Sequence, residues 1–341
     1  MTREVKTETS ACGTLVVSLD FELFWGVRDI IAVEDYRDRL LGTHRVVPLL
    51  LDLFRDYGIH ATWAIVGFLF FESQKELVNH LPNRKPAYAD QRLSPYPYIS
   101  NMDGDGRNDL YHFAPSLVQR IQAMPGQELA TQTFSHYYCL EDGQTGEDFK
   151  EDLEFAIQQA EKVGCRIRSL IFPRNQFNPE YLPICKELGI TACRANEAAW
   201  YYQGKKRRDY NYLPSRAFRL MDSYLNLSGD NCYPLPSYGD FPISLPSSRY
   251  LRPYSSRLHF LDPLRQKRIT TAMTKAARAN QIYHLWWHPE DVAININENL
   301  DFMKILLDHF NELKSKYGMQ SLNMEEVTSR CQQEAESRIR I

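Results

Sequence analysis

The sequence predicts an α/β fold in which parallel strands alternate with helices. Short apolar, β-branched runs recur along the chain, and most are followed by an amphipathic stretch that ends at a glycine. The length of 341 residues suits one large domain of this kind. Such alternation gives either an open doubly wound sheet or a closed or distorted barrel, and in both folds ligands bind at the carboxyl ends of the strands.

The first strand, helix and strand lie between residues 14 and 67. Thr14 to Asp20 (TLVVSLD) and Ala61 to Gly67 (ATWAIVG) are predicted to be buried strands, because both runs are short and apolar. Between them, Thr43 is expected to cap a helix that has its apolar positions on one face and ends at Gly58.

The same pattern recurs along the rest of the chain. Further strands are predicted at Glu128 to Phe134, Ser169 to Phe172, Thr191 to Ala195 and Gln281 to Trp287. Further helices are predicted at Glu147 to Val163, Pro179 to Leu188, Pro263 to Asn280 and Asn299 to Tyr317.

Two segments interrupt the alternation, at about residues 71–125 and 197–260, and we expect them to form long irregular rim loops. We expect a single domain over residues 1–341, with a core at about 14–318. The tail, residues 319–341, is expected to be helical, and its last 20 residues to form an exposed charged helix.

Composition excludes several classes of protein. Hydrophobic residues make up 43% and charged residues 24%, which excludes global disorder. The net charge of -3 gives no broad positive field, which argues against nucleic acid or anionic lipid as the main partner. The expected partner is therefore a small-molecule or carbohydrate substrate.

The chain is also expected to stay in the cytoplasm. Met1 to Gly13 is polar and lacks the apolar stretch of a secretory signal, and no run of about 20 apolar residues suggests membrane insertion. The seven cysteines are scattered and never form a C-x-x-C pair, which is typical of reduced thiols.

Two acids stand at the end of the first strand, in the sequence SLDFELFWG. Asp20 and Glu22 are two positions apart, so in an extended segment their carboxylates point the same way. Two like charges at one place require solvation, a proton or a cation. The alternative is that one of them caps a turn.

Histidines follow two other strands. His136 comes just beyond the strand in ELATQTFSH, with Gln132 four residues earlier. A lone histidine is more often structural, but acids at a neighbouring strand end favour a functional role. His288 ends the last strand and is the better candidate for general acid or base, whereas His284 is expected to lie deeper, in the core. Arg174 follows the fourth strand and either orders a carboxylate bidentately or forms a surface salt bridge.

Taken in order, the motifs SLDFE, ATWAIVG, ELATQTFSH, SLIFPRNQ, KELGITACRAN and HLWWH resemble those of the polysaccharide deacetylase (NodB-homology) family, carbohydrate esterase class four. The resemblance spans roughly Thr14 to Pro289. It implies a distorted (β/α) barrel of about seven parallel strands with long rim loops. It also implies hydrolysis of acetyl groups on sugars with a bound divalent metal, often zinc.

The resemblance assigns roles by position. Asp20 matches the catalytic base, Glu22 the metal-binding acid, and His136 the second histidine of the family's H-x-x-x-H metal motif. Arg174 matches the arginine that holds the base, and His288 the histidine that protonates the leaving amine. The implied reaction is attack on an amide carbonyl by a water that Asp20 deprotonates.

One position departs from the family pattern. Gln132 stands where the family has the first histidine, so the implied ligand set is Glu22, Gln132 and His136. An amide oxygen is a poorer zinc ligand than imidazole, which leaves catalytic competence open. The alternatives are a sugar-binding relative without catalysis, and a hydrolase of a non-sugar carbon–nitrogen bond.

Several residues are candidates for contacts with substrate. The predicted substrate-binding residues are Trp25, Asn175, Gln176 and Trp287, and Trp200 is a rim candidate for stacking on a sugar. The basic run Lys205 to Arg208 suggests either phosphate binding or, more often for such runs, a solvated patch.

Overall fold

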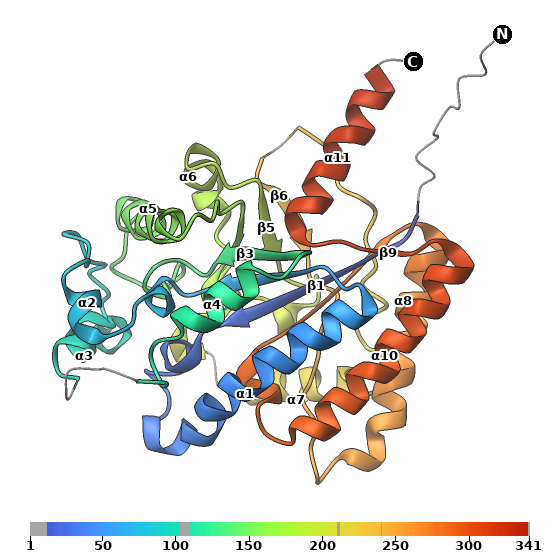
Figure 1. Ribbon diagram of the computed structural model, residues 1–341, viewed down its shortest axis with the longest axis horizontal. Coiled ribbons are helices and arrows are strands. Elements are labelled where there is room, and N and C mark those ends of the chain that lie inside the picture. Colours follow the sequence, from blue (N-terminus) through green and yellow to red (C-terminus); the bar gives the residue numbers. More distant parts are fainter. Residues whose placement is uncertain (1–11, 103–108, 210–211, 240, 340–341) are drawn as a thin grey trace.

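A computed structural model describes residues 12–102, 109–209, 212–239 and 241–339. Its centre is a parallel sheet with the strand order β6-β5-β4-β3-β2-β1-β8-β7, and a short ninth strand pairs with β1 (Figure 1). The strands are β1 (Thr14–Phe21), β2 (Ala61–Ile65), β3 (Gln127–Thr131), β4 (Ser169–Ile171), β5 (Ala192–Ala195), β6 (Ile243–Pro246), β7 (Arg249–Tyr250), β8 (Ile282–Trp287) and β9 (Gln320–Ser321).

The two ends of this sheet are joined by one continuous segment. β6 pairs with β5, and β7, two residues further on, pairs with β8. Between them, the amide of Ser247 donates to the carbonyl of Ala195 at 2.9 Å and that of Ser248 donates to His284 at 2.8 Å. The segment from β6 to β7 therefore links the two ends of the sheet. The predicted distorted barrel of about seven parallel strands is confirmed.

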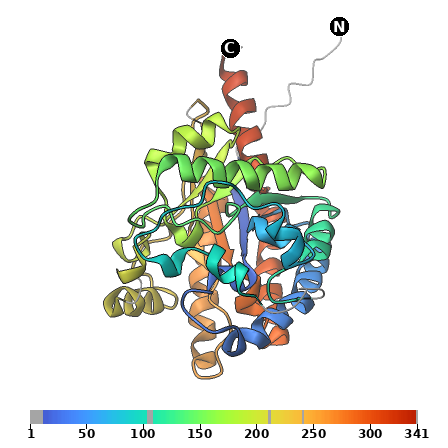
Figure 2. The ribbon, with the colours of Figure 1, turned by 90° about the vertical axis from the view of Figure 1, so that its left-hand side faces the viewer.

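Helices surround the barrel, as the two perpendicular views show (Figures 1 and 2). They are α1 (Val33–Tyr57), α2 (Gln74–Val78), α3 (Tyr96–Ser100), α4 (Pro115–Gln122), α5 (Gly146–Lys162), α6 (Leu182–Glu187), α7 (Leu213–Asp222), α8 (Asp262–Ala279), α9 (Pro289–Val292), α10 (Ile296–Tyr317) and α11 (Met324–Ile339). The long helices bury one apolar face against the sheet, as their periodic apolar positions predict.

The predicted elements are present, but some ends differ. α1 begins at Val33, so Thr43 lies inside the helix, where its hydroxyl donates to the carbonyl of Arg39 at 2.8 Å instead of capping. β3 ends at Thr131 rather than at Phe134, because the chain turns at Thr133 with a φ of 64°.

The two long segments are more regular than expected. The first contains α2, α3 and α4, and the second contains α7, β6 and β7. The two strands of the second segment are only four and two residues long and are joined by serines, so they present no apolar run that sequence periodicity could detect.

The C-terminal helix closes the amino end of the barrel. Met324, Val327 and Cys331 of α11 are buried and join an interior cluster with Val16 and Ala64 from the first two strands. The expectation of an exposed charged helix is therefore wrong for the first half of α11, while its second half extends away from the body (Figure 1).

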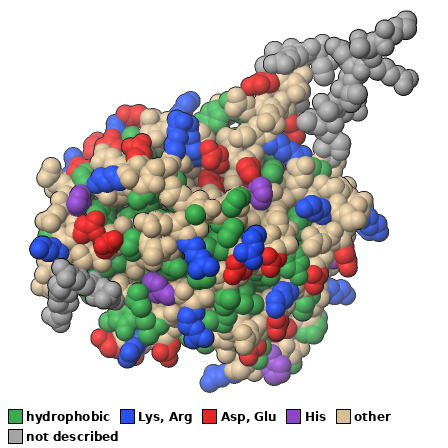
Figure 3. Space-filling model, viewed as in Figure 1, with side chains coloured by type: hydrophobic (Ala, Val, Ile, Leu, Met, Phe, Trp, Pro, Cys, Tyr) green, Lys and Arg blue, Asp and Glu red, His purple; other side chains and the backbone are tan. Residues whose placement is uncertain are grey.

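Within the described residues, no helix is long and apolar enough to cross a membrane. All seven cysteines are free, in agreement with the expected reduced thiols. On the face drawn in Figure 3, basic and acidic side chains are interspersed, as the small net charge predicts.

Candidate active site

The alternation of β1 brings polar side chains into the barrel. Val16 lies in the interior cluster, and two residues further on the hydroxyl of Ser18 contacts His284 and Arg194. Two more residues along, Asp20 is buried near the carboxyl end of the strand. Strand geometry alone therefore aligns Ser18 beneath Asp20.

Asp20 is held by Arg194, from β5. The two terminal nitrogens of Arg194 each donate to one carboxylate oxygen of Asp20 at 2.6 Å. The same guanidinium donates to Asn175 Oδ1 at 2.9 Å and lies over the ring of Trp286, 4.3 Å from its centroid. The bidentate partner of the expected base is therefore Arg194, and the expectation that Arg174 holds it is wrong.

Arg174 has a different partner. Its backbone has a φ of 53°, and its guanidinium donates to Asp29 and lies over the ring of Tyr138. Arg207 also donates to Asp29, at 2.8 Å. Although burial acts against it, the positive charge of Arg174 lowers the pKa of Asp29. Arg174 nevertheless lines the same cavity as Asp20.

Glu22 lies among two histidines. Its Oε1 is 3.2 Å from Nε2 of His136 and 3.7 Å from Nε2 of His288. Burial alone would raise the pKa of Glu22, but the charges of His136 and His288 lower it to about 2. The carboxylate folds back over Gly26, where an added methyl group would lie 1.7 Å from Glu22 Oε2.

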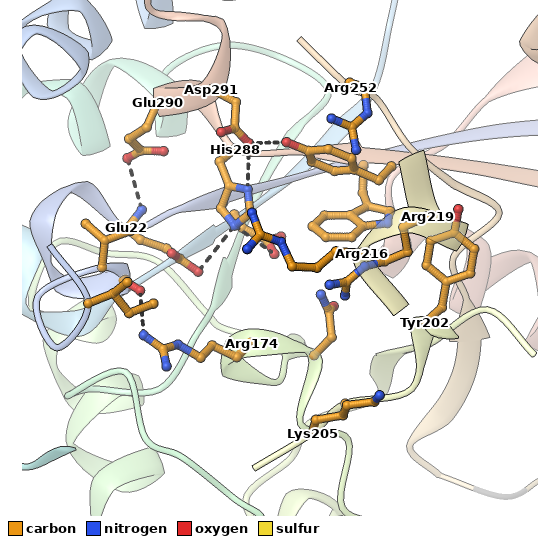
Figure 4. Close-up of a pocket in the computed structure, with 18 of the residues that line it drawn as sticks. Glu22, Arg174, Tyr202, Lys205, Arg216, Arg219, Arg252, His288, Glu290 and Asp291 are labelled. Carbon is orange, nitrogen blue, oxygen red and sulfur yellow. Dashed lines mark hydrogen bonds and ion pairs between the residues drawn. The ribbon is translucent and has the colours of Figure 1, made fainter. Parts of the chain in front are cut away.

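His288 is positioned from the other side by α9. Its Nδ1 is 3.0 Å from Oδ2 of Asp291, which also accepts a hydrogen bond from Tyr250 at 2.6 Å (Figure 4). Burial opposes protonation, but the charges of Glu22 and Asp291 raise the pKa of His288. Its Nε2 lies 3.9 Å from Asp20 Oδ2, so His288 faces both acids.

Glu290 and His284 frame this cluster. Glu290 accepts a hydrogen bond from the amide of Leu23 at 2.6 Å, and burial raises its pKa to about 8. His284 lies beneath, with Nε2 2.8 Å from Ser18 Oγ, and burial together with the charge of Arg194 lowers its pKa to about 3. His284 is thus the core histidine that the sequence predicted.

His136 is carried by a tight turn after β3. Its φ is 59°, and Asp152 of α5 accepts hydrogen bonds from the amides of Phe134 at 2.7 Å and Ser135 at 3.2 Å. In the same turn Gln132 is fully buried, and neither polar atom of its amide has a hydrogen-bond partner among the described residues.

The residues present suit a divalent cation. Ligand atoms of Asp20, Glu22 and His288 all lie within 4.8 Å of one another, and His136 adds a second imidazole at Glu22. Carboxylate and imidazole together suit zinc, iron or manganese. The unpartnered amide of Gln132, one turn from His136, is a further oxygen donor. Glu22 is thus common to the group of three ligand atoms and to the contact with His136.

A cavity of about 770 Å³ opens above this cluster. Among its lining residues are Asp20, Glu22, Arg174, Asn175, Glu197, Tyr202, Lys205, Arg216, Arg219, Tyr250, Arg252, Trp286, His288, Glu290 and Asp291. Its volume is in the range of small-molecule sites. One wall is α7, which belongs to a segment that the sequence indicated only as a rim loop.

Of the four predicted substrate-binding residues, Asn175 lines the cavity. The others are buried in the interior: Trp25 donates to the carbonyl of His112 at 2.7 Å, Trp287 packs near Phe54, and Gln176 donates to Glu141 at 2.8 Å. These three residues are therefore interior residues that do not line the cavity. The side chain that reaches the cavity from the end of β8 is that of Trp286.

This fold and this cluster define an α/β-barrel protein with acids and histidines at the carboxyl ends of parallel strands. Residues 38–193 match the family model for polysaccharide deacetylases. The match includes Gln132, His136 and Arg174, whereas Asp20 and His288 lie outside it. Comparison with curated protein sequences gave no match.

Solved structures share the fold. A putative polysaccharide deacetylase from Mycobacterium smegmatis is 12% identical with a TM-score of 0.59, over 96% of this chain and 92% of that one. A probable polysaccharide deacetylase from Pseudomonas aeruginosa PAO1 is 11% identical with a TM-score of 0.51, over 93% and 89%. PuuE allantoinase is 10% identical with a TM-score of 0.51, over 94% and 90%.

Proposed function

We propose that the protein is a metal-dependent hydrolase that removes the acetyl group from an N-acetylated sugar or a polysaccharide precursor. The observation that supports this most is the convergence of Asp20, Glu22 and His288 at the carboxyl end of the barrel. The family match of residues 38–193 supports a hydrolase of the deacetylase type.

The proposed cation ligands are Glu22, His136 and Gln132, and zinc is the proposed metal. When bound, a divalent cation polarises the carbonyl of the amide and lowers the pKa of water. Glu22 and His136 already lie within 3.2 Å of each other, and the buried amide of Gln132 needs a polar partner. The rival set is Asp20, Glu22 and His288.

The protein's own groups supply the proton transfers. In this proposal Asp20 takes the proton of the attacking water, and Arg194 keeps its carboxylate in one orientation through two hydrogen bonds. His288, oriented by Asp291, gives a proton to the leaving amine as the carbon–nitrogen bond breaks.

The sequence left two other functions open. A sugar-binding relative without catalysis has no chemical need for a buried bidentate pair at Asp20 together with an oriented His288. Hydrolysis of a non-sugar amide would use the same groups and would differ only in substrate. The cytoplasmic location stays a prediction.

The experiment measures metal content and acetate release together. Protein purified without chelators or affinity metals is analysed for bound metal, then assayed with added zinc, manganese or cobalt on a panel of N-acetylated sugars. We expect near-stoichiometric metal in the wild type, and acetate release that is absent in Asp20→Asn. Metal-free wild type with no acetate release under any of these metals would contradict the proposal and favour the non-catalytic relative.

A further inference from the structure

One wall of the cavity is positively charged. Lys205, Arg216, Arg219 and Arg252 all line it. Arg216 and Arg219 extend from α7 into the cavity, and α7 itself lies at the edge of the molecule (Figures 2 and 4). We propose that this wall binds a phosphate group attached to the substrate, so that the sugar is a phosphorylated N-acetyl sugar. The inference rests on the proposed function and specifies its substrate class.

Within the described part of the chain, none of these four cations forms an ion pair. Lys205 donates to the hydroxyl of Ser215 at 2.7 Å, and Arg252 donates to that of Ser223 at 3.3 Å. Both partners are neutral, so the positive charge of the wall is uncompensated.

The cations that follow Lys205 in the sequence do have carboxylate partners. Lys206 pairs with Asp142, and Arg207 pairs with Asp29. Arg208 also has a carboxylate near it, at 3.6 Å on Asp209. The basic run at residues 205–208 is therefore compensated except at Lys205, the member that lines the cavity. Among the described residues of this run, the charge without a carboxylate partner therefore lies at the cavity.

The floor of the cavity has the opposite character, and its charges are paired. Asp20 is satisfied by Arg194, and Asp291 by His288 and Tyr250. A neutral sugar would leave the cationic wall without a partner, whereas a ligand with a neutral amide at one end and a phosphate at the other matches both ends.

The geometry of α7 suits a phosphate. Arg216 and Arg219 are three positions apart, so they are neighbours on one helical face. Guanidinium groups bind phosphate oxygens bidentately, and each such charge-assisted contact is stronger than a neutral hydrogen bond. Arg252, which follows β7, approaches the cavity from a separate segment. Two segments thus contribute to one anion subsite.

The phosphate has two possible sources. Leu213, Phe218 and Met221 of α7 are exposed apolar side chains beside the cationic wall. This apolar surface suits a lipid-linked sugar phosphate, while the cations alone suit a soluble one. The phosphate is common to both sources, and the two are separated by experiment.

The test compares two soluble probes that differ by one phosphate, N-acetylglucosamine 1-phosphate and N-acetylglucosamine. Their binding is measured by calorimetry on Asp20→Asn protein, so that no turnover is required. We expect the phosphorylated probe to bind at least about tenfold more tightly, and this preference to be lost in the double variant Arg216→Ala/Arg219→Ala. Arg45→Ala removes an exposed arginine of α1 that lies outside the cavity lining, and should leave the preference unchanged.

Equal binding of the two probes, or a preference that survives the double variant, would overturn the inference. The charge reversal Arg216→Glu gives a second reading, because it should weaken the phosphorylated probe more than alanine does. Sedimentation with vesicles that contain a lipid-linked sugar phosphate assigns the source. If the anion preference holds while no acetate is released from any substrate, the proposed hydrolysis fails and the anion subsite stands. If neutral sugars are hydrolysed as fast as phosphorylated ones, the inference fails alone.

Discussion

Both carboxylate oxygens of Asp20 lie 2.6 Å from terminal nitrogens of Arg194, in an ion pair whose side chains are 3% and 1% exposed. The pair joins β1 to β5 across the barrel interior. Because water hardly reaches it, the pair fixes one orientation of the carboxylate that is proposed to accept a proton.

Arg194→Lys tests this relationship. A lysine keeps the positive charge but cannot donate two parallel hydrogen bonds to one carboxylate, so kcat should fall by roughly 10- to 100-fold with little change in KM. Arg174→Lys is the matched control, and its effect on kcat should be smaller because Arg174 pairs with Asp29. Steady-state kinetics on variants of confirmed fold decide the matter. A larger kcat loss in Arg174→Lys would restore the role that the family pattern gave to Arg174.

The two ligand sets are distinguished by a pair of histidine variants. His136→Ala should remove bound metal, whereas His288→Ala should retain metal and lose turnover, because His288 is proposed to act as the general acid. Elemental analysis and acetate release on both proteins give the answer. The reverse pattern, with metal lost only in His288→Ala, would assign the cation to Asp20, Glu22 and His288.

Gly26→Ala should act on Glu22 without disturbing the fold. The new methyl group would lie 1.7 Å from Glu22 Oε2, and the end of this side chain can move aside. We expect metal affinity to fall by about tenfold or more, since even changes behind a ligand have effects of this size. Calorimetric titration with zinc measures the affinity, and thermal unfolding checks that stability changes little. Unchanged affinity would show that this orientation of Glu22 is not needed for binding.

Glu128 should make stability depend on pH. Its carboxylate is buried at the amino end of β3, where it accepts hydrogen bonds from Thr62 at 2.7 Å and from the amide of Glu325 at 3.1 Å. Burial raises its pKa to about 7 from 4.5, so the folded state favours the protonated form. Stability from this group is therefore greatest below about pH 4.5 and is lost as the pH rises through about 7, by roughly 3 kcal/mol in total.

Glu128→Gln removes the ionisation. The variant should be more stable than the wild type at pH 8, and the difference between them should shrink toward pH 5. Denaturant unfolding at a series of pH values measures this difference, and a gap that does not vary with pH would contradict the raised pKa.

The sequence identified most of the site because its residues follow strands that are visible as apolar runs. Asp20 and Glu22 come at the end of β1, and His288 comes at the end of β8, so the parallel fold was enough to bring them together. His136 was also found, although the turn that carries it, with a φ of 59°, could not be predicted from periodicity.

The choice between two arginines could not be made in the same way. Arg194 is inside β5, where alternation directs its side chain into the barrel, while Arg174 lies beyond β4 in a left-handed turn that directs it elsewhere. The family pattern assigned a role only to Arg174 and says nothing of this turn. The cationic wall was missed for a related reason, because α7 lies within a segment that has few periodic signals.

The site joins segments that lie far apart in the sequence, and this has a consequence for synthesis. Ser18 and His284 are separated by 266 positions, and Asp20 and Arg194 by 174. During synthesis, Asp20 therefore has no partner until β5 emerges, and β8 cannot insert beside β1 until the long stretch between them has been made. A product truncated before residue 288 could pair Asp20 with Arg194 but would lack the histidine that faces both acids.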